Sequence, residues 1–91
     1  MNDEPIGDAP TRRGPARVQR APQGALVRTG SPPVPVMLND TALALWELCD
    51  GQTTVDEMVD AVCELFALPR QRASADVDRA LEEMRTAGLL L

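Results

Sequence analysis

Closely spaced helix boundaries between residues 39 and 57 are the feature that most constrains the fold. Asn39 and Asp40 are residues that cap helix N-termini, and Gly51 is typical of a position just past a helix end. Thr54 and Glu57 have the spacing of a capping box. The sequence therefore predicts one helix that begins at residue 39 or 40 and stops at Asp50-Gly51, and a second that begins after Thr54.

Apolar residues recur at helical spacing in both segments, which predicts a buried stripe on each helix. Trp46 lies on the first stripe, so we expect it to be a core residue and not a platform on which a peptide stacks. The first stripe is Ala42, Leu45, Trp46 and Cys49; the second is Val55, Met58, Val59, Val62, Leu65 and Phe66.

A third helix is expected to begin at Ser74 as the N-cap, with Asp76 in its first turn. Gly88 should close this helix, and the apolar residues 89–91 should fold back on the body. Its predicted apolar positions are Val77, Ala80, Leu81, Met84 and Gly88.

Residues 17–38 show short apolar runs separated by turn residues, a pattern that predicts a three-stranded antiparallel meander. The runs are centred on Val18, on 25–27 and on 34–38. Three strands followed by three short helices predict an α+β domain of winged-helix-like fold.

Prolines in the third strand indicate which of its edges is free. Successive residues of a strand direct their backbone groups to opposite sides, so Pro33, Pro35 and Met37 share one edge. Because proline has no N–H to donate, we expect this edge to be free and the edge of residues 34, 36 and 38 to pair with the second strand. Such an edge either protects against aggregation or receives a guest strand.

The length and the charge of the chain limit its possible domain organisation and partners. The chain has 91 residues, enough for one small domain, and we expect residues 1–16 to form a disordered tail before a domain of residues 17–91. Residues 36–91 carry eleven carboxylates against four arginines, so this part should repel a phosphate backbone. The third helix is acidic where a DNA-reading helix needs donors, which argues against nucleic-acid binding.

Several chemistries lack the residues that they require. The chain has no His, and Cys49 and Cys63 stand alone, so neither a zinc site, another metal site nor a catalytic centre is expected. Asp56, Asp60 and Glu64 on one helix face are more typical of a solvated or docking surface than of a metal site. No segment is apolar enough to span a membrane, and we expect a cytoplasmic protein with reduced thiols and no bound cofactor.

The pattern resembles the PqqD family, the small peptide chaperones of pyrroloquinoline quinone (PQQ) synthesis. The fold of this family recurs as a leader-peptide recognition element in other peptide-modifying pathways. The resemblance extends over about residues 17–91 and is close from residue 38 onward; the first two strands depart from the family pattern. It rests on residues 38–42, 45–51, Thr54-Val55, Met58-Val59, Asp76-Val77, Leu81 and 87–90.

The resemblance implies a non-enzymatic module that binds the leader of a ribosomally made precursor peptide by strand addition and presents it to a modifying enzyme. In the family this enzyme is of the radical S-adenosylmethionine (SAM) type. An acidic winged-helix transcriptional regulator or a protein-interaction module is the alternative, and an enzyme or metal carrier is the least favoured reading. The expected peptide-binding residues are Val34, Pro35, Val36, Met37, Ala80, Leu81, Met84 and Ala87.

Overall fold

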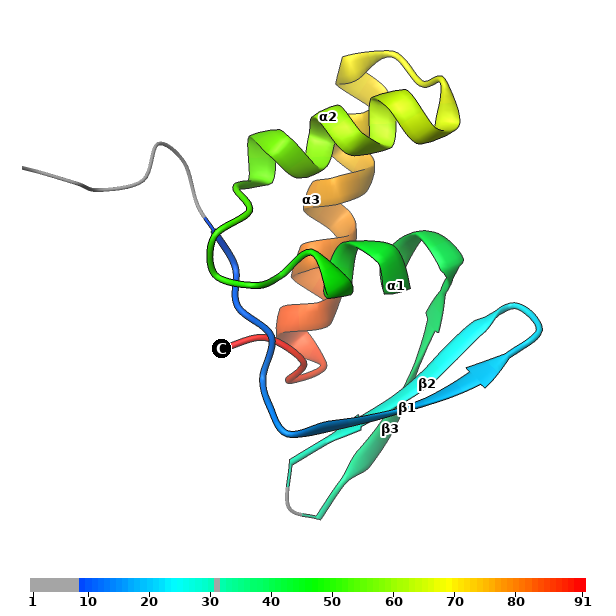
Figure 1. Cartoon of the computed structure of the whole chain (residues 1–91), viewed down its shortest axis with the longest axis vertical. Coiled ribbons are helices and arrows are strands. Elements are labelled where there is room, and N and C mark those ends of the chain that lie inside the picture. The colour runs from blue at the N-terminus through cyan, green and yellow to red at the C-terminus, as the bar shows by residue number, and fades with distance from the viewer. Residues whose placement is uncertain (1–8, 31) are drawn as a thin grey trace, which may run out of the picture.

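A three-stranded sheet and three helices on one side of it form the structure (Figure 1). The computed structural model describes residues 9–30 and 32–91. This arrangement confirms the predicted α+β fold. The elements are β1 (Ala16–Ala21), β2 (Gly24–Thr29), β3 (Val34–Asn39), α1 (Asp40–Glu47), α2 (Val55–Phe66) and α3 (Arg70–Thr86).

The sheet is the predicted antiparallel meander, with β2 in the centre and β3 at one edge. Val27 of β2 lies opposite Val18 on one side and Val36 on the other. Ala25 and Val27 are fully buried on the face that turns toward the helices. Among the helices, α1 makes the extensive contacts with β2 and β3, while α2 packs against α3.

The predicted caps of the first two helices are confirmed. Asn39 Oδ1 accepts the N–H of Ala42 at 2.8 Å, so Asn39 is the N-cap of α1. Thr54 and Glu57 accept each other's backbone N–H groups at 2.8 and 3.1 Å, which completes the capping box of α2. Helix α1 ends at Glu47, before the stop that we predicted at Asp50-Gly51.

The third helix begins at Arg70, so the predicted start at Ser74 is wrong. Ala67 adopts a left-handed conformation that ends α2, and Pro69 then occupies the N-cap position with an extended backbone. Proline suits a helix start because its missing N–H would have no partner there. Arg70 forms ion pairs with Asp56 and Asp60 of α2, which holds the first turn in place.

The end of α2 also differs from the prediction, because Leu65 and Phe66 are not core residues. Leu65 is 71% exposed and Phe66 is 47% exposed, whereas Met58, Val59 and Val62 are buried. The last turn of α2 lies at the corner where the chain turns into α3 (Figure 1). The apolar stripe therefore continues beyond the part of the helix that α3 covers.

Residues 10–13, here called the N-terminal strap, correct the prediction that residues 1–16 are disordered. The N–H of Arg12 donates to the carbonyl of Cys49 at 2.8 Å, and the N–H of Arg13 donates to that of Leu89 at 2.9 Å. Pro10 and Thr11 accept the N–H groups of Gly51 and Leu91, each at 2.9 Å. Because backbone hydrogen bonds hold this segment, its amino-acid composition did not indicate that it would pack against the domain. Residues 1–8 of the predicted tail lie outside the described residues.

Gly51 is required by the strap and by the turn after α1. Its φ of +80° lies in the left-handed region, which disfavours residues with a Cβ. A Cβ at this position would also lie 2.9 Å from Thr11 Oγ1 of the strap. The residue that we predicted as a helix stop thus also allows the close approach of two chain segments.

Trp46 is buried at 5% exposure, as expected of a core residue. Its Nε1–H donates to the carbonyl of Leu89 at 3.3 Å, which ties α1 to the segment after α3. The guanidinium of Arg12 lies 5.4 Å from the centroid of the indole and donates through Nη1 to the carbonyl of Glu47 at 2.7 Å. Leu89 and Leu90 are buried and Leu91 is exposed, so the C-terminal residues fold back as predicted except for the last one.

We expect Arg12→Ala to lower the free energy of unfolding by about 1–2 kcal/mol, because it removes a charged donor to a helix C-terminus and a cation–π contact. Urea denaturation followed by Trp46 fluorescence measures this change. Arg13→Ala is the matched control, since Arg13 contributes its backbone to the strap and its side chain is exposed. Equal stability of the two variants would contradict the role assigned to the Arg12 side chain.

Burial raises the pKa of the Cys49 thiol to about 11, although Arg12 and Arg85 oppose part of this effect. An unfolded thiol titrates at about 9, so the folded state retains this proton at a pH where the unfolded state loses it. We therefore expect the free energy of unfolding to fall as pH rises from about 9 to about 11. Cys49→Ala should reduce this fall and Cys63→Ala should still show it, in urea denaturation at several pH values. An unchanged pH dependence in Cys49→Ala would contradict the assignment.

Candidate functional site

One face of α3 is turned toward the open side of β3. Asp76, Ala80, Glu83 and Ala87 follow one another at intervals of four, three and four residues, so they lie on one side of the helix. Ala80 is half-buried, and Glu83 and Ala87 are exposed. Because two of the four are alanines, little side-chain volume fills the space in front of α3.

Two hollows lie along this face, one at each end of β3. The first has a volume of about 200 Å³ and the second of about 220 Å³. We call the surface that contains both hollows the β3–α3 face. Asn39, Thr41, Ala42, Asp76, Arg79, Ala80 and Glu83 line the first hollow, and Arg13, Thr29, Gly30, Pro32, Val34, Ala87 and Gly88 line the second.

The structure brings several predicted peptide-binding residues to this surface. Val34 and Ala87 line the second hollow, and Ala80 lines the first. Val36 is half-buried between Val34 and the buried Leu38 on the same face of β3. These four residues come from two elements that are far apart in the sequence, and together they form the apolar part of the β3–α3 face.

Leu81 and Met84 do not belong to this surface. They are 2% and 1% exposed and pack in the core, and Leu81 lies on the side of α3 that faces Val55 of α2. A peptide would have to displace core packing to reach either of them. We therefore assign both residues to stability and leave them out of the proposed peptide contacts.

Pro35 and Met37 can contribute only their backbone to a site on the β3–α3 face. Side chains alternate along a strand, so these two point away from the helices, and Met37 is 56% exposed. Pro35 lies opposite Arg28 in the sheet and has no N–H with which to pair. We infer that the ladder with β2 uses the backbone of Val34, Val36 and Leu38, and that the backbone of residues 33, 35 and 37 forms the outer edge.

The β3–α3 face carries charges of both signs, with Asp76, Arg79 and Glu83 at the first hollow and Arg13 at the second. The carboxylate of Asp76 pairs with Arg79 at 3.0 Å and with Arg72 at 3.4 Å, so its charge is largely compensated. No ion pair is described for Glu83 among residues 9–30 and 32–91, and its carboxylate is exposed in the first hollow. A ligand with a basic group near Glu83 would therefore be favoured.

Sequence reasoning missed several residues of this surface. Asp76 and Glu83 could have been found from the spacing that they share with Ala80 and Ala87. Arg13 could not, because it reaches the second hollow only through the strap. The sequence predicted Asn39 as a helix cap. In the structure it caps α1 and also lines the first hollow.

Several carboxylates elsewhere have structural partners. Asp56 and Asp60 face Arg70, and Asp50 accepts the N–H groups of Thr53 and Gln52, which lowers the pKa of its carboxyl. Within the described part of the chain, no group of three or more His, Cys, Asp or Glu side chains is arranged to hold a metal ion. No helix among these residues is long and apolar enough to cross a membrane.

Comparison with known proteins identifies the family. The family model described as coenzyme PQQ synthesis protein D (PqqD) matches residues 31–90. The match begins at the turn before β3 and therefore includes all three helices, whereas the resemblance was expected from residue 17. Searches of curated proteins and of solved structures gave no match. The chain therefore belongs to the PqqD family and is a peptide-binding protein related to PQQ synthesis.

Proposed function

We propose that this protein is a non-catalytic, cytoplasmic peptide chaperone that binds the leader of a ribosomally made precursor peptide on the β3–α3 face. The leader adds a strand at the outer edge of β3, and the rest of the precursor extends to a modifying enzyme of the radical SAM type. The pathway is PQQ synthesis or the synthesis of a related peptide-derived natural product. Membership of the PqqD family supports this proposal.

The single observation that carries the proposal is the position of β3. It is an edge strand of a three-stranded sheet, and a hollow that is also lined by residues of α3 or of its C-terminal end lies at each end of β3. An extended peptide on such an edge is held by backbone hydrogen bonds, while pockets for alternate side chains give specificity. One set of guest side chains would enter the hollows beside Ala80 and Ala87.

Because proline has no N–H, the outer edge of β3 offers few hydrogen-bond donors. Between residues 33 and 37 the outer edge offers the carbonyls of Pro33, Pro35 and Met37 and the single N–H of Met37. Each hydrogen bond contributes about 0.5–1.5 kcal/mol, so the leader must depend more on side-chain contacts than it would on an edge without proline. Glu83 then favours a leader with a basic side chain near the first hollow.

Neither the site nor the helices favour the other functions that we considered. The chain has no His, and burial makes the Cys49 thiol a poor nucleophile because it raises its pKa to about 11. Asp78 and Glu82 are exposed on α3, where a DNA-reading helix would need donors to base edges. These features favour a binding module over an enzyme or a transcriptional regulator.

We expect Pro35→Val to tighten leader binding by up to about 1 kcal/mol, roughly fivefold, because it adds a second N–H to the outer edge. Met37→Pro should weaken binding by at least as much, because it removes the one donor present. Isothermal titration calorimetry with the leader of the cognate precursor peptide measures both effects. Identical affinities in the wild type and both folded variants would exclude the edge of β3 as the peptide site.

The α3 side of the site has its own test. Ala87→Arg places a long side chain in the second hollow and should weaken leader binding at least about tenfold, because it blocks a guest side chain. Ala75→Arg is the matched control, since Ala75 is an exposed alanine of α3 that lines neither hollow. Equal binding by the two variants would remove α3 from the proposed site.

A further inference from the structure

The face of the sheet that is turned away from the helices carries a pair of arginines. Arg17 of β1 and Arg28 of β2 lie directly opposite one another, on the face opposite that of the buried Val27. Residues directly opposite have Cβ atoms about 5 Å apart, and like charges in such positions are destabilising. Arg28 Nη1 donates to Gln19 Oε1 at 3.2 Å, a neutral acceptor that leaves the charge uncompensated.

Among residues 9–30 and 32–91, no described ion pair joins a carboxylate to either arginine. Residues 9–39 contain five arginines and neither Asp nor Glu. The ion pairs described for residues 9–30 and 32–91 all join side chains of α2 and α3, on the other side of the sheet. The sheet therefore holds two like charges together with no described counter-charge; Arg17 is exposed and Arg28 is half-buried.

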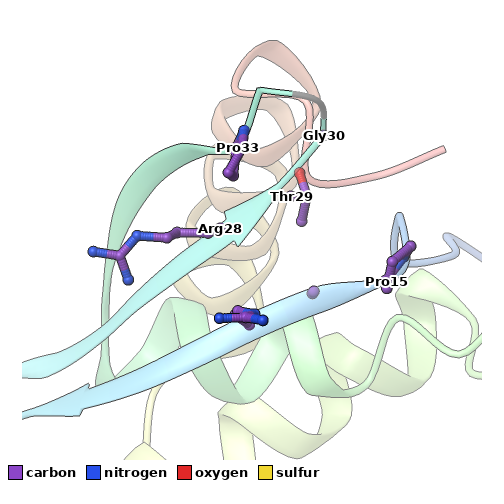
Figure 2. Close-up of a pocket in the computed structure, with 7 residues that line it drawn as sticks. Pro15, Arg28, Thr29, Gly30 and Pro33 are labelled. Carbon is purple, nitrogen blue, oxygen red and sulfur yellow. The ribbon is translucent and has the colours of Figure 1, made fainter.

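The two arginines border a hollow of about 270 Å³ (Figure 2). Pro15, just before β1, and Pro33, in the turn before β3, supply apolar walls. Further along the same face, Leu26 lies opposite Met37, which is 56% exposed. The surface thus combines paired cationic groups with aliphatic contacts, and guanidinium groups bind carboxylates through paired, charge-assisted hydrogen bonds.

We propose that this Arg17–Arg28 surface docks a partner protein that presents Asp or Glu side chains beside an aliphatic side chain. The carboxylates bind between the two guanidinium groups, and the aliphatic group rests on Leu26 and Met37. Charge complementarity favours a protein over a nucleic acid, because residues 36–91 carry a net charge of −7 that repels a polyanion. A second copy of this chain is less suited, since each copy has a net charge of −5.

This surface meets the β3–α3 face only at the turn before β3, where Thr29 and Gly30 line both hollows. The side chains of Arg17 and Arg28 lie on the opposite side of the sheet from α3, so a peptide on α3 leaves them open. The proposal does not rest on the proposed leader binding, and it would stand if that binding failed. The Ala87→Arg variant tests the leader site alone, whereas variants of the arginine pair test only the docking surface.

The test uses the full chain and two synthetic peptides, Ac-Gly-Leu-Glu-Leu-Glu-Gly-NH2 and its counterpart with Gln in place of Glu. In ¹⁵N-resolved NMR titrations at low salt, the Glu peptide should shift the amides around Arg17 and Arg28 and bind at least about tenfold more tightly than the Gln peptide. About 0.5 M salt should abolish this preference, because it screens exposed charges.

The double variant Arg17→Gln/Arg28→Gln should lose the preference for the Glu peptide. Its melting temperature at low salt should equal or exceed that of the wild type, because the variant removes a like-charge pair. Arg20→Gln is the matched control, since Arg20 is an exposed arginine of β1 on the other face of the sheet, and it should retain the preference.

Four results would overturn the proposal. The first is equal affinity for the Glu and Gln peptides in the wild type, and the second is an unchanged preference in the folded double variant. The third is tighter binding of duplex DNA than of the Glu peptide, lost in the double variant, which would assign the surface to nucleic acid. Self-association of the wild type that depends on the two arginines would likewise replace the partner protein by a second copy.

Discussion

The contact between Trp46 and Leu89 joins parts of the chain that would otherwise be separate. The indole of Trp46 belongs to α1, which packs on the sheet, and Leu89 follows α3. Arg12 of the N-terminal strap covers the same indole and bonds to the end of α1. Since α1 is the helix that contacts both β3 and α3, this junction fixes the position of α3 relative to the edge of the sheet. The β3–α3 face depends on that position.

Charge is divided between the two layers of the fold. In the strap and the sheet, all the charged residues that the structure describes are arginines. The helices hold all the described ion pairs and carry a net negative charge. The acidic helical layer can bind a basic partner on one side of the fold, and the basic sheet can bind an acidic partner on the other side. This division is compatible with a small adaptor that holds a peptide on one side and contacts a protein on the other. The family, coenzyme PQQ synthesis protein D, is consistent with such a role.

Features that depend on a few neighbouring residues could be predicted from the sequence. The caps at Asn39 and Thr54 follow from side chains that bond to the backbone three residues on, so tertiary packing was not needed to find them. The strands followed from apolar alternation and turn residues. The start of α3 was misplaced because Ser74 is a good N-cap in isolation, whereas Pro69 and the pairing of Arg70 with α2 decide the actual start.

Signals within a few residues of one another specify the elements, their order and the donor-poor edge of β3, because helix periodicity, capping and the missing N–H of proline act locally. Which apolar residues become core depends instead on how the elements pack together. Leu81 and Ala80 are neighbours on one amphipathic helix, and either could face the core until α2 and the sheet are in place. Packing against α2 buries Leu81 and leaves Ala80 beside β3. The N-terminal strap was decided in the same way, since its backbone partners exist only after residues 49–51 and 89–91 have come together.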